Sequence, residues 1–272
     1  MKGIAFGQYY PTDSVLHRID PRIKIILTIL YIICSFLCKN ILSYALLLAS
    51  VLILVGLGRV PLKIVFKGLR AILFVLAFTA FLNIFWTRGE NLIFSWGFIN
   101  IYTEGLYAAL FIIIRMTTLI IGTGMFLTYT TTPITLTNAI EDLLSPLKLL
   151  HVPVHSFAMM MTIALRFIPT LSEETDKIMT AQKARGADFS SGSLLDRAKA
   201  LIPVLIPLFV SAFNRAADLA TAMECRCYNG DKGRTRMTVR HLRFVDVVWL
   251  FIIVVFAAAL VWLNILGIGY TV

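Results

Sequence analysis

The sequence predicts an all-α integral membrane protein with about five transmembrane helices and a domain of long helices on the cytoplasmic side. The first reason is composition: 58% of the 272 residues are hydrophobic, 15% are charged, and the mean hydropathy is +0.84. Soluble domains have roughly 45–50% apolar and about 25% charged residues, so a water-soluble enzyme and a disordered chain are both excluded. The other two reasons are the spacing of the apolar runs and the uneven distribution of the basic residues.

Five apolar runs are candidates for transmembrane helices. A helix needs about 20 residues to cross the hydrocarbon core, and roughly 17–25 are tolerated. The first two runs are near or below the lower limit and form a tight hairpin, so the basic residues beside them must extend their side chains to the interface. The five runs are Ile23–Leu37, Ile41–Leu57, Ala71–Trp86, Gly105–Thr128 and Val247–Ile268.

The basic residues indicate the orientation of the chain. With the N-terminus inside, the cytoplasmic segments are Met1–Lys24, Gly58–Arg70 and Tyr129–Arg243, which contain 22 of the 25 Lys and Arg residues. The outer turns contain only Lys39 and Arg88. Cytoplasmic loops of membrane proteins are rich in Lys and Arg, so we expect a multi-pass protein with a cytoplasmic N-terminus and an outside C-terminus. The net charge of +10 reflects this bias, and nucleic acid is not expected as a partner.

The chain divides into three predicted segments. Residues 1–128 form a membrane domain of four spans, residues 129–244 a cytoplasmic domain, and residues 245–272 a C-terminal transmembrane helix. In the middle segment, Thr132-Pro133 predicts a helix start, because Pro suits the first helical position. Two long helices follow, from Val154 to Lys183 and from Leu194 to about Cys225, with a Ser/Gly linker between them. Each begins apolar and ends polar, which predicts that only its second half reaches into the cytosol.

The polar ends of these two helices resemble each other. Thr180–Gly186 and Thr221–Cys227 share Thr-Ala, two variable residues, a small residue, Arg and a second small residue. Gly186 suits the left-handed position just past a helix, and Asn229-Gly230 is expected to do the same slightly later in the second copy. A single Arg at such a place is readily interpreted as a basic helix cap, which contributes about 0.3–1 kcal/mol.

The pairing of the two ends favours a second interpretation. Two rigid helices each present one guanidinium at the tip, with small neighbours that let the tip enter a groove of a partner. Arg is a common hot spot of protein interfaces, where its truncation costs about 2 kcal/mol or more. Two similar tips predict two similar receiving surfaces, such as a dimeric cytoplasmic partner. The candidate docking residues are Ala184, Arg185, Gly186, Cys225, Arg226 and Cys227.

Arg115 is a charge within the fourth apolar run. At the bilayer centre an Arg costs about 2.5–3.5 kcal/mol, so such a residue is first considered functional. Glu104 precedes it by eleven residues, or three helical turns, which places both on one side of the helix about 16 Å apart and too far to pair. One buried polar contact between helices is common in membrane bundles. We therefore favour a structural interpretation over a coupling role, in which Arg115 contacts polar atoms of a neighbour such as Asn83.

Several catalytic and transport motifs do not occur in the sequence. It has no phosphate-binding loop and no His-Glu-x-x-His, and no Asp or Glu lies in the middle of a predicted span. Cys225 and Cys227 have a spacing that can ligate zinc, but no His or Cys cluster completes four ligands. We expect no enzyme activity and no cofactor or metal bound by this chain. The alternatives are a stand-alone secondary transporter with a polar mid-membrane cavity and an integral-membrane enzyme.

Five segments carry motifs that occur in the same order in a known protein family. They are Ser14–Lys24, Thr103–Leu106 with Arg115, Leu143–Lys148, Ala164–Thr170 and Ala181–Gly186. The family that they resemble is the transmembrane (T) component of energy-coupling factor (ECF) transporters, the vitamin- and metal-uptake branch of the ABC transporters. The resemblance covers nearly the whole chain. Its most specific part is the Ala-Arg-Gly motif, and the second copy, Cys-Arg-Cys, departs from the family pattern at both flanks.

The resemblance implies a function as well as a fold. In the family, two long coupling helices cross, and the arginines at their ends dock into grooves of two ABC-type ATPase subunits, implied to be a heterodimer that binds ATP and Mg²⁺. A separate small membrane protein captures the vitamin or metal. The resemblance thus implies that residues 129–244 are a coupling domain and that Arg185 and Arg226 dock the ATPases. The chain would be a scaffold in the bacterial plasma membrane that links ATP hydrolysis to reorientation of the capture subunit.

Overall fold

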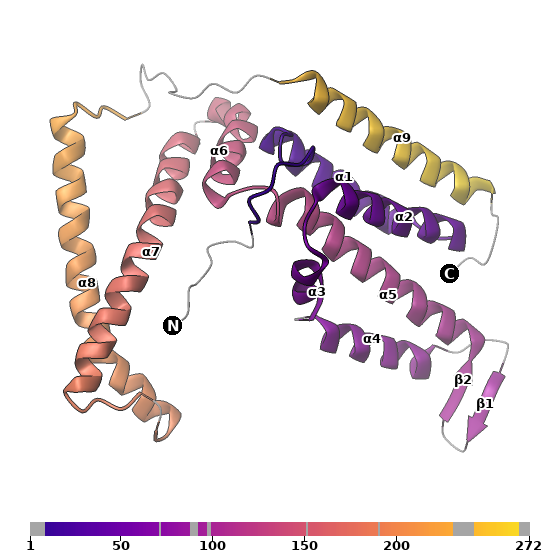
Figure 1. The fold of residues 1–272 in the computed structure, drawn as a ribbon, viewed down its shortest axis with the longest axis horizontal. Helices are drawn as coiled ribbons and strands as arrows, with labels where there is room; N and C mark the ends of the chain where they lie inside the picture. Colours follow the sequence, from indigo (N-terminus) through magenta and orange to yellow (C-terminus); the bar gives the residue numbers. More distant parts are fainter. Residues whose placement is uncertain are drawn as a thin grey trace. The chain divides into compact units, whose positions relative to one another are not determined.

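Almost all of the described elements are helices, as predicted, and the chain divides into two units (Figure 1). The computed structural model describes residues 9–70, 72–87, 92–96, 99–150, 152–189, 191–230 and 242–266. The bundle unit comprises residues 7–136 and 239–272, and the arm unit comprises residues 1–6 and 137–238. The C-terminal helix therefore belongs to the same unit as the N-terminal helices. The predicted borders at residues 128 and 244 stay a prediction.

The bundle unit contains all five predicted apolar runs. Each run coincides with a helix to within three residues at every end that the structure describes, and residues 267 and 268 of the last run lie outside the described residues. The fourth run is an α-helix that ends in a π-helical turn, η1. The helices of this unit are α1 (Pro21–Leu37), α2 (Ile41–Gly58), α3 (Leu62–Arg70), α4 (Leu73–Trp86), α5 (Thr103–Thr123), η1 (Gly124–Thr128) and α9 (Phe244–Leu266).

A short β-hairpin between α4 and α5 departs from the all-helical prediction. Strands β1 (Leu92–Trp96) and β2 (Ile99–Tyr102) pair antiparallel, with an irregularity between Leu92 and Phe94. The hairpin leads directly into the first residue of α5. Such a short pair has too few residues to stand out from the apolar runs on either side, which explains why periodicity did not reveal it.

Among the residues that the structure describes, five helices are long and apolar enough to cross a membrane: α2, α5 with η1, α7, α8 and α9. The number agrees with the prediction, but the set differs, because it includes the two long helices predicted as cytoplasmic. Their apolar first halves account for this result. α1, with 17 residues, lies at the lower end of the tolerated range. The 14-residue α4 reaches span length only together with α3, from which it is bent away. The cytoplasmic placement of α7 and α8 stays a prediction.

The core of the bundle unit is formed where α1 packs against α5, η1 and α9. The ring of Tyr31 on α1 lies edge-on to Phe126 and stacks on Phe256, with centroid separations of 5.8 and 6.5 Å. A Cβ atom on Gly122 would collide with the Tyr31 ring. Small residues at helix contacts allow close backbone approach in membrane bundles, so Gly122 permits α5 to lie against α1.

Buried polar groups join α9 to the start of α1. Asp20 caps α1 by accepting a hydrogen bond from the Arg22 amide, and its own amide donates to Oδ1 of Asp246 at 2.8 Å. Asp246 also accepts from the Arg243 amide at 2.8 Å and is 1% exposed. One turn along α1, the buried Lys24 ammonium donates to the Thr130 carbonyl at 2.9 Å. These contacts satisfy backbone groups that the ends of α1, η1 and α9 leave unpaired.

The arm unit is built on two long helices that cross, α7 (Val154–Ala184) and α8 (Leu194–Cys225) (Figure 1). Both agree with the predicted bounds to within one residue. Helix α6 (Pro133–Leu143), which begins at the predicted Pro, and the 3₁₀ turn Ser145–Leu150 precede them. His155 Nδ1 lies 2.9 Å from Glu141 Oε1 and connects α7 to α6. Helix α8 begins with a reciprocal capping box between Ser193 and Asp196.

Candidate functional site

The tip of α7 ends in a Schellman motif with Arg185 at the cap position. The Gly186 amide donates to the Lys183 carbonyl at 3.0 Å, and the Ala187 amide donates to the Gln182 carbonyl at 3.0 Å. Gly186 has φ +88°, in the left-handed region where glycine is favoured. The two hydrogen bonds satisfy carbonyls at the helix end and hold the backbone that carries Arg185.

The tip of α8 repeats this geometry 41 residues later. The Cys227 amide donates to the Glu224 carbonyl at 2.9 Å, and the Tyr228 amide donates to the Met223 carbonyl at 3.0 Å. Cys227, with φ +56°, occupies the left-handed position. The helix ends at Cys225, as predicted, but Asn229-Gly230 does not cap it. The same pair of hydrogen bonds closes the helix at Cys227, three residues before Gly230, and holds a non-glycine residue in the strained conformation.

Both tip arginines are exposed and stand at the ends of different helices. In the described part of the chain, neither guanidinium forms an ion pair or a hydrogen bond. Their small neighbours are exposed as well, so each guanidinium projects without a bulky side chain beside it. The exposed tip residues are Ala184, Arg185, Gly186, Cys225, Arg226 and Cys227. Their use for docking stays a prediction.

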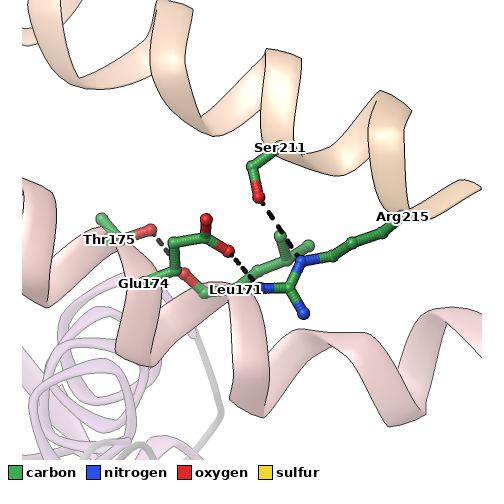
Figure 2. A network of polar contacts seen from close by, with 5 residues as sticks. All are labelled: Leu171, Glu174, Thr175, Ser211 and Arg215. Carbon is green, nitrogen blue, oxygen red and sulfur yellow. Dashed lines mark hydrogen bonds and ion pairs between the residues drawn. The ribbon is translucent and has the colours of Figure 1, made fainter.

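An ion pair between α7 and α8 is a feature that sequence reasoning missed. Arg215 Nη2 donates to Glu174 Oε2 at 2.8 Å, and Arg215 Nε donates to Ser211 Oγ at 3.4 Å, as Figure 2 shows. In the sequence, Glu174 stands out only as a charged residue in the polar half of its helix. The sequence does contain an indication of this ion pair. Glu174 and Arg215 are 41 residues apart, which is the same spacing that separates Arg185 from Arg226. The ion pair thus joins equivalent positions of the repeat.

Arg115 ties α5 to the turn between α1 and α2. Its Nη2 donates to the Cys38 carbonyl at 3.0 Å and to the hydroxyl of Tyr44, whose ring centroid lies 5.4 Å from the guanidinium carbon. The structural interpretation of Arg115 therefore fits its contacts, but the expected partner was wrong. Asn83 instead donates to the Thr79 carbonyl within its own helix at 2.8 Å.

Glu104 and Arg115 lie at different levels of α5. Glu104 is in the first turn of that helix and accepts a hydrogen bond from the Thr103 hydroxyl at 3.2 Å. The two predicted residues are thus not brought together. Among the described residues, no group of three or more His, Cys, Asp and Glu side chains is arranged to hold a metal ion.

The chain is similar to proteins of one family along almost its whole length. Residues 12–239 match the family described as "cobalt transport protein" (CbiQ). A protein of Ruminiclostridium cellulolyticum named energy-coupling factor transporter transmembrane protein EcfT is 55% identical, over 94% of this chain and 95% of its own. The chain belongs to this family of ECF transporter transmembrane proteins.

Other members confirm the match. EcfT of Clostridium kluyveri is 49% identical over 98% of this chain and 97% of its own, and EcfT of Bacillus subtilis is 50% identical over 87% and 89%. The resemblance inferred from the motifs is therefore confirmed, and the chain is a multi-pass membrane protein of this family. The matched residues include both Arg tips, the Glu174–Arg215 pair and Arg115.

Proposed function

We propose that the chain is the scaffold and coupling subunit of an ECF-type importer. It links ATP hydrolysis by two cytoplasmic ABC-type ATPase subunits, a heterodimer, to reorientation of a small membrane subunit that captures a vitamin or metal. ATP and Mg²⁺ are bound by the ATPases, and this chain is not catalytic. The observation that carries the proposal is the pair of exposed arginines, held by the same cap geometry at the ends of two long helices.

The chemistry of the tips suits docking to acidic grooves. A guanidinium presents five donors in a planar fork that matches carboxylates, and it stays charged in any partner environment. The Schellman bonds hold the backbone beneath each guanidinium, so the conformational entropy lost when the tip enters a groove is that of the Arg side chain and not of the backbone. Two tips with the same backbone geometry fit two related surfaces, which a pair of homologous ATPase subunits provides.

The docking proposal is tested by reversing the charge of the tips. We expect Arg185→Glu combined with Arg226→Glu to abolish co-purification of the ATPase pair and ATP-driven uptake, while the protein still inserts into the membrane. The matched control is Arg197→Glu, the same charge reversal at an exposed position in the first turn of α8. Unchanged co-purification in the tip variant, or an equal loss in the control, would contradict the proposal.

The native cysteines test the orientation of the tips. Cys225 and Cys227 are exposed, whereas Cys34 and Cys38 are buried. In the proposed orientation, a membrane-impermeant maleimide labels the unmodified protein in inside-out vesicles and leaves it unlabelled in intact cells. Bound ATPases protect the same thiols, because docking covers the α8 tip. Labelling from the outside would contradict the orientation, and labelling that ATPases do not slow would contradict docking at this tip.

A further inference from the structure

The ion pair between α7 and α8 occupies a region where little else determines how the helices align. Among the described residues, α7 has no buried residue after Ala158, and α8 has none after Val204. Glu174 and Arg215 are themselves partly shielded, with 23% and 38% of their side-chain surfaces exposed. Partly exposed apolar side chains can slide past one another at little cost, whereas a polar pair is satisfied in one register only. Single polar contacts set helix register in this way in coiled coils.

The ion pair lies the same number of residues from each Arg tip. Glu174 lies eleven residues before Arg185, and Arg215 lies eleven residues before Arg226. With a rise of about 1.5 Å per residue, the pair is about 16 Å from each tip along its helix. Sliding one helix along the other by one turn would move one tip by about 5 Å relative to the other and break the pair.

We propose that Glu174 and Arg215 are positioning residues that fix the register of α7 against α8 and thereby the separation of the two Arg tips. The proposal rests on the proposed function, since a fixed separation matters only if two tips must enter two receiving surfaces at once. Ser211, one turn before Arg215, contributes by holding Nε of the guanidinium while Nη2 faces Glu174 (Figure 2). Neither member of the pair is proposed to touch the partner.

The separation of the tips can be measured directly in the full-length chain. Ala184 and Cys225 occupy equivalent exposed positions, so Ala184→Cys combined with Cys227→Ser leaves one accessible thiol per tip. Nitroxide labels on these two thiols report the inter-tip distance by pulsed electron resonance in lipid nanodiscs, without ATPases. With the ion pair intact we expect one narrow distance distribution. Glu174→Ala should add a population in which the inter-tip distance differs by up to about 5 Å, the length of one helical turn.

Two further variants separate positioning from a general loss of structure. Arg215→Ala should produce the same displaced population, and the exchange Glu174→Arg with Arg215→Glu should restore the single distribution. The matched control Glu173→Ala removes an exposed carboxylate of the same helix and should change nothing. An unchanged distribution in Glu174→Ala, or an exchanged pair as broad as the single variant, would overturn the proposal. Because no ATPase is present, this result is independent of whether the tips dock.

Discussion

The bundle unit and the arm unit hold their helices together by different means. In the bundle unit, buried side chains from α1, α2, α5, η1 and α9 form one continuous cluster that includes Tyr31, Leu47 and Leu260. In the arm unit, the buried residues of α7 lie only at its start, at Val154 and Ala158. The geometry of the bundle is therefore set by its own packing. The geometry of the arms depends on helix caps, on the Glu174–Arg215 ion pair and, in our proposal, on the surfaces of other subunits.

This contrast implies that substitutions should act differently in the two units. Within the bundle, removal of a buried polar group leaves its partners unsatisfied and lowers the stability of the whole unit. Within the arms, an exposed substitution should change the affinity for a partner or the separation of the tips, with little effect on unfolding.

The largest effect is expected at Asp246. Asp246→Leu leaves the buried amide of Asp20 and the partly buried amide of Arg243 without an acceptor, which should lower the free energy of unfolding by about 2–6 kcal/mol, because each unsatisfied group costs about 1–3 kcal/mol. Thermal unfolding in detergent measures this loss. Glu173→Leu, the same replacement of a carboxylate at an exposed position of α7, should change stability by less than about 0.5 kcal/mol. Equal losses in both variants would remove the distinction between the units.

A smaller loss is expected at Arg115. Arg115→Leu removes the partly buried hydrogen bonds to the Cys38 carbonyl and the Tyr44 hydroxyl, both donated by Nη2, which should lower the free energy of unfolding by about 1.5–3 kcal/mol in total. The unfolding temperature should fall accordingly, whereas Met116→Leu, at an exposed neighbouring position of α5, should leave it almost unchanged. If ATP-driven uptake were lost in a fully stable Arg115→Leu protein, the residue would have a coupling role instead.

The smallest effects are expected at the left-handed cap residues of the two tips, Gly186 and Cys227. Cys227→Gly should relieve the left-handed strain at the α8 tip and stabilise it by about 1 kcal/mol, whereas Gly186→Cys should destabilise the α7 tip by a similar amount. Because helix ends open locally, amide hydrogen exchange of the tip peptides is the suitable measurement, with a change of about fivefold expected in each direction. Exchange that changes in the same direction at both tips would contradict the equivalence of their caps.

Much of the fold and of the candidate site was accessible from local patterns. The apolar runs in the sequence are sufficient to locate the long helices of the bundle unit. The Thr-Ala-x-x-small-Arg-small repeat is sufficient to locate the tips of α7 and α8. The two missed side-chain partners share one cause. The partner of Arg115 proved to be Tyr44 and not Asn83, and the partner of Glu174 proved to be Arg215, because each contact joins helices whose mutual rotation is not encoded in either helix alone.

The sequence by itself determined, to within three residues, where the five apolar helices and the two long helices begin and end, which family the chain resembles and which two arginines stand at helix tips. These properties depend on the hydropathy, spacing and identity of residues close together in the chain. Only the tertiary structure decided that α9 returns to α1 through Asp246 and that Glu174 meets Arg215. Those outcomes depend on how whole helices pack against each other, where distances of a few ångströms between residues far apart in sequence select one set of polar partners.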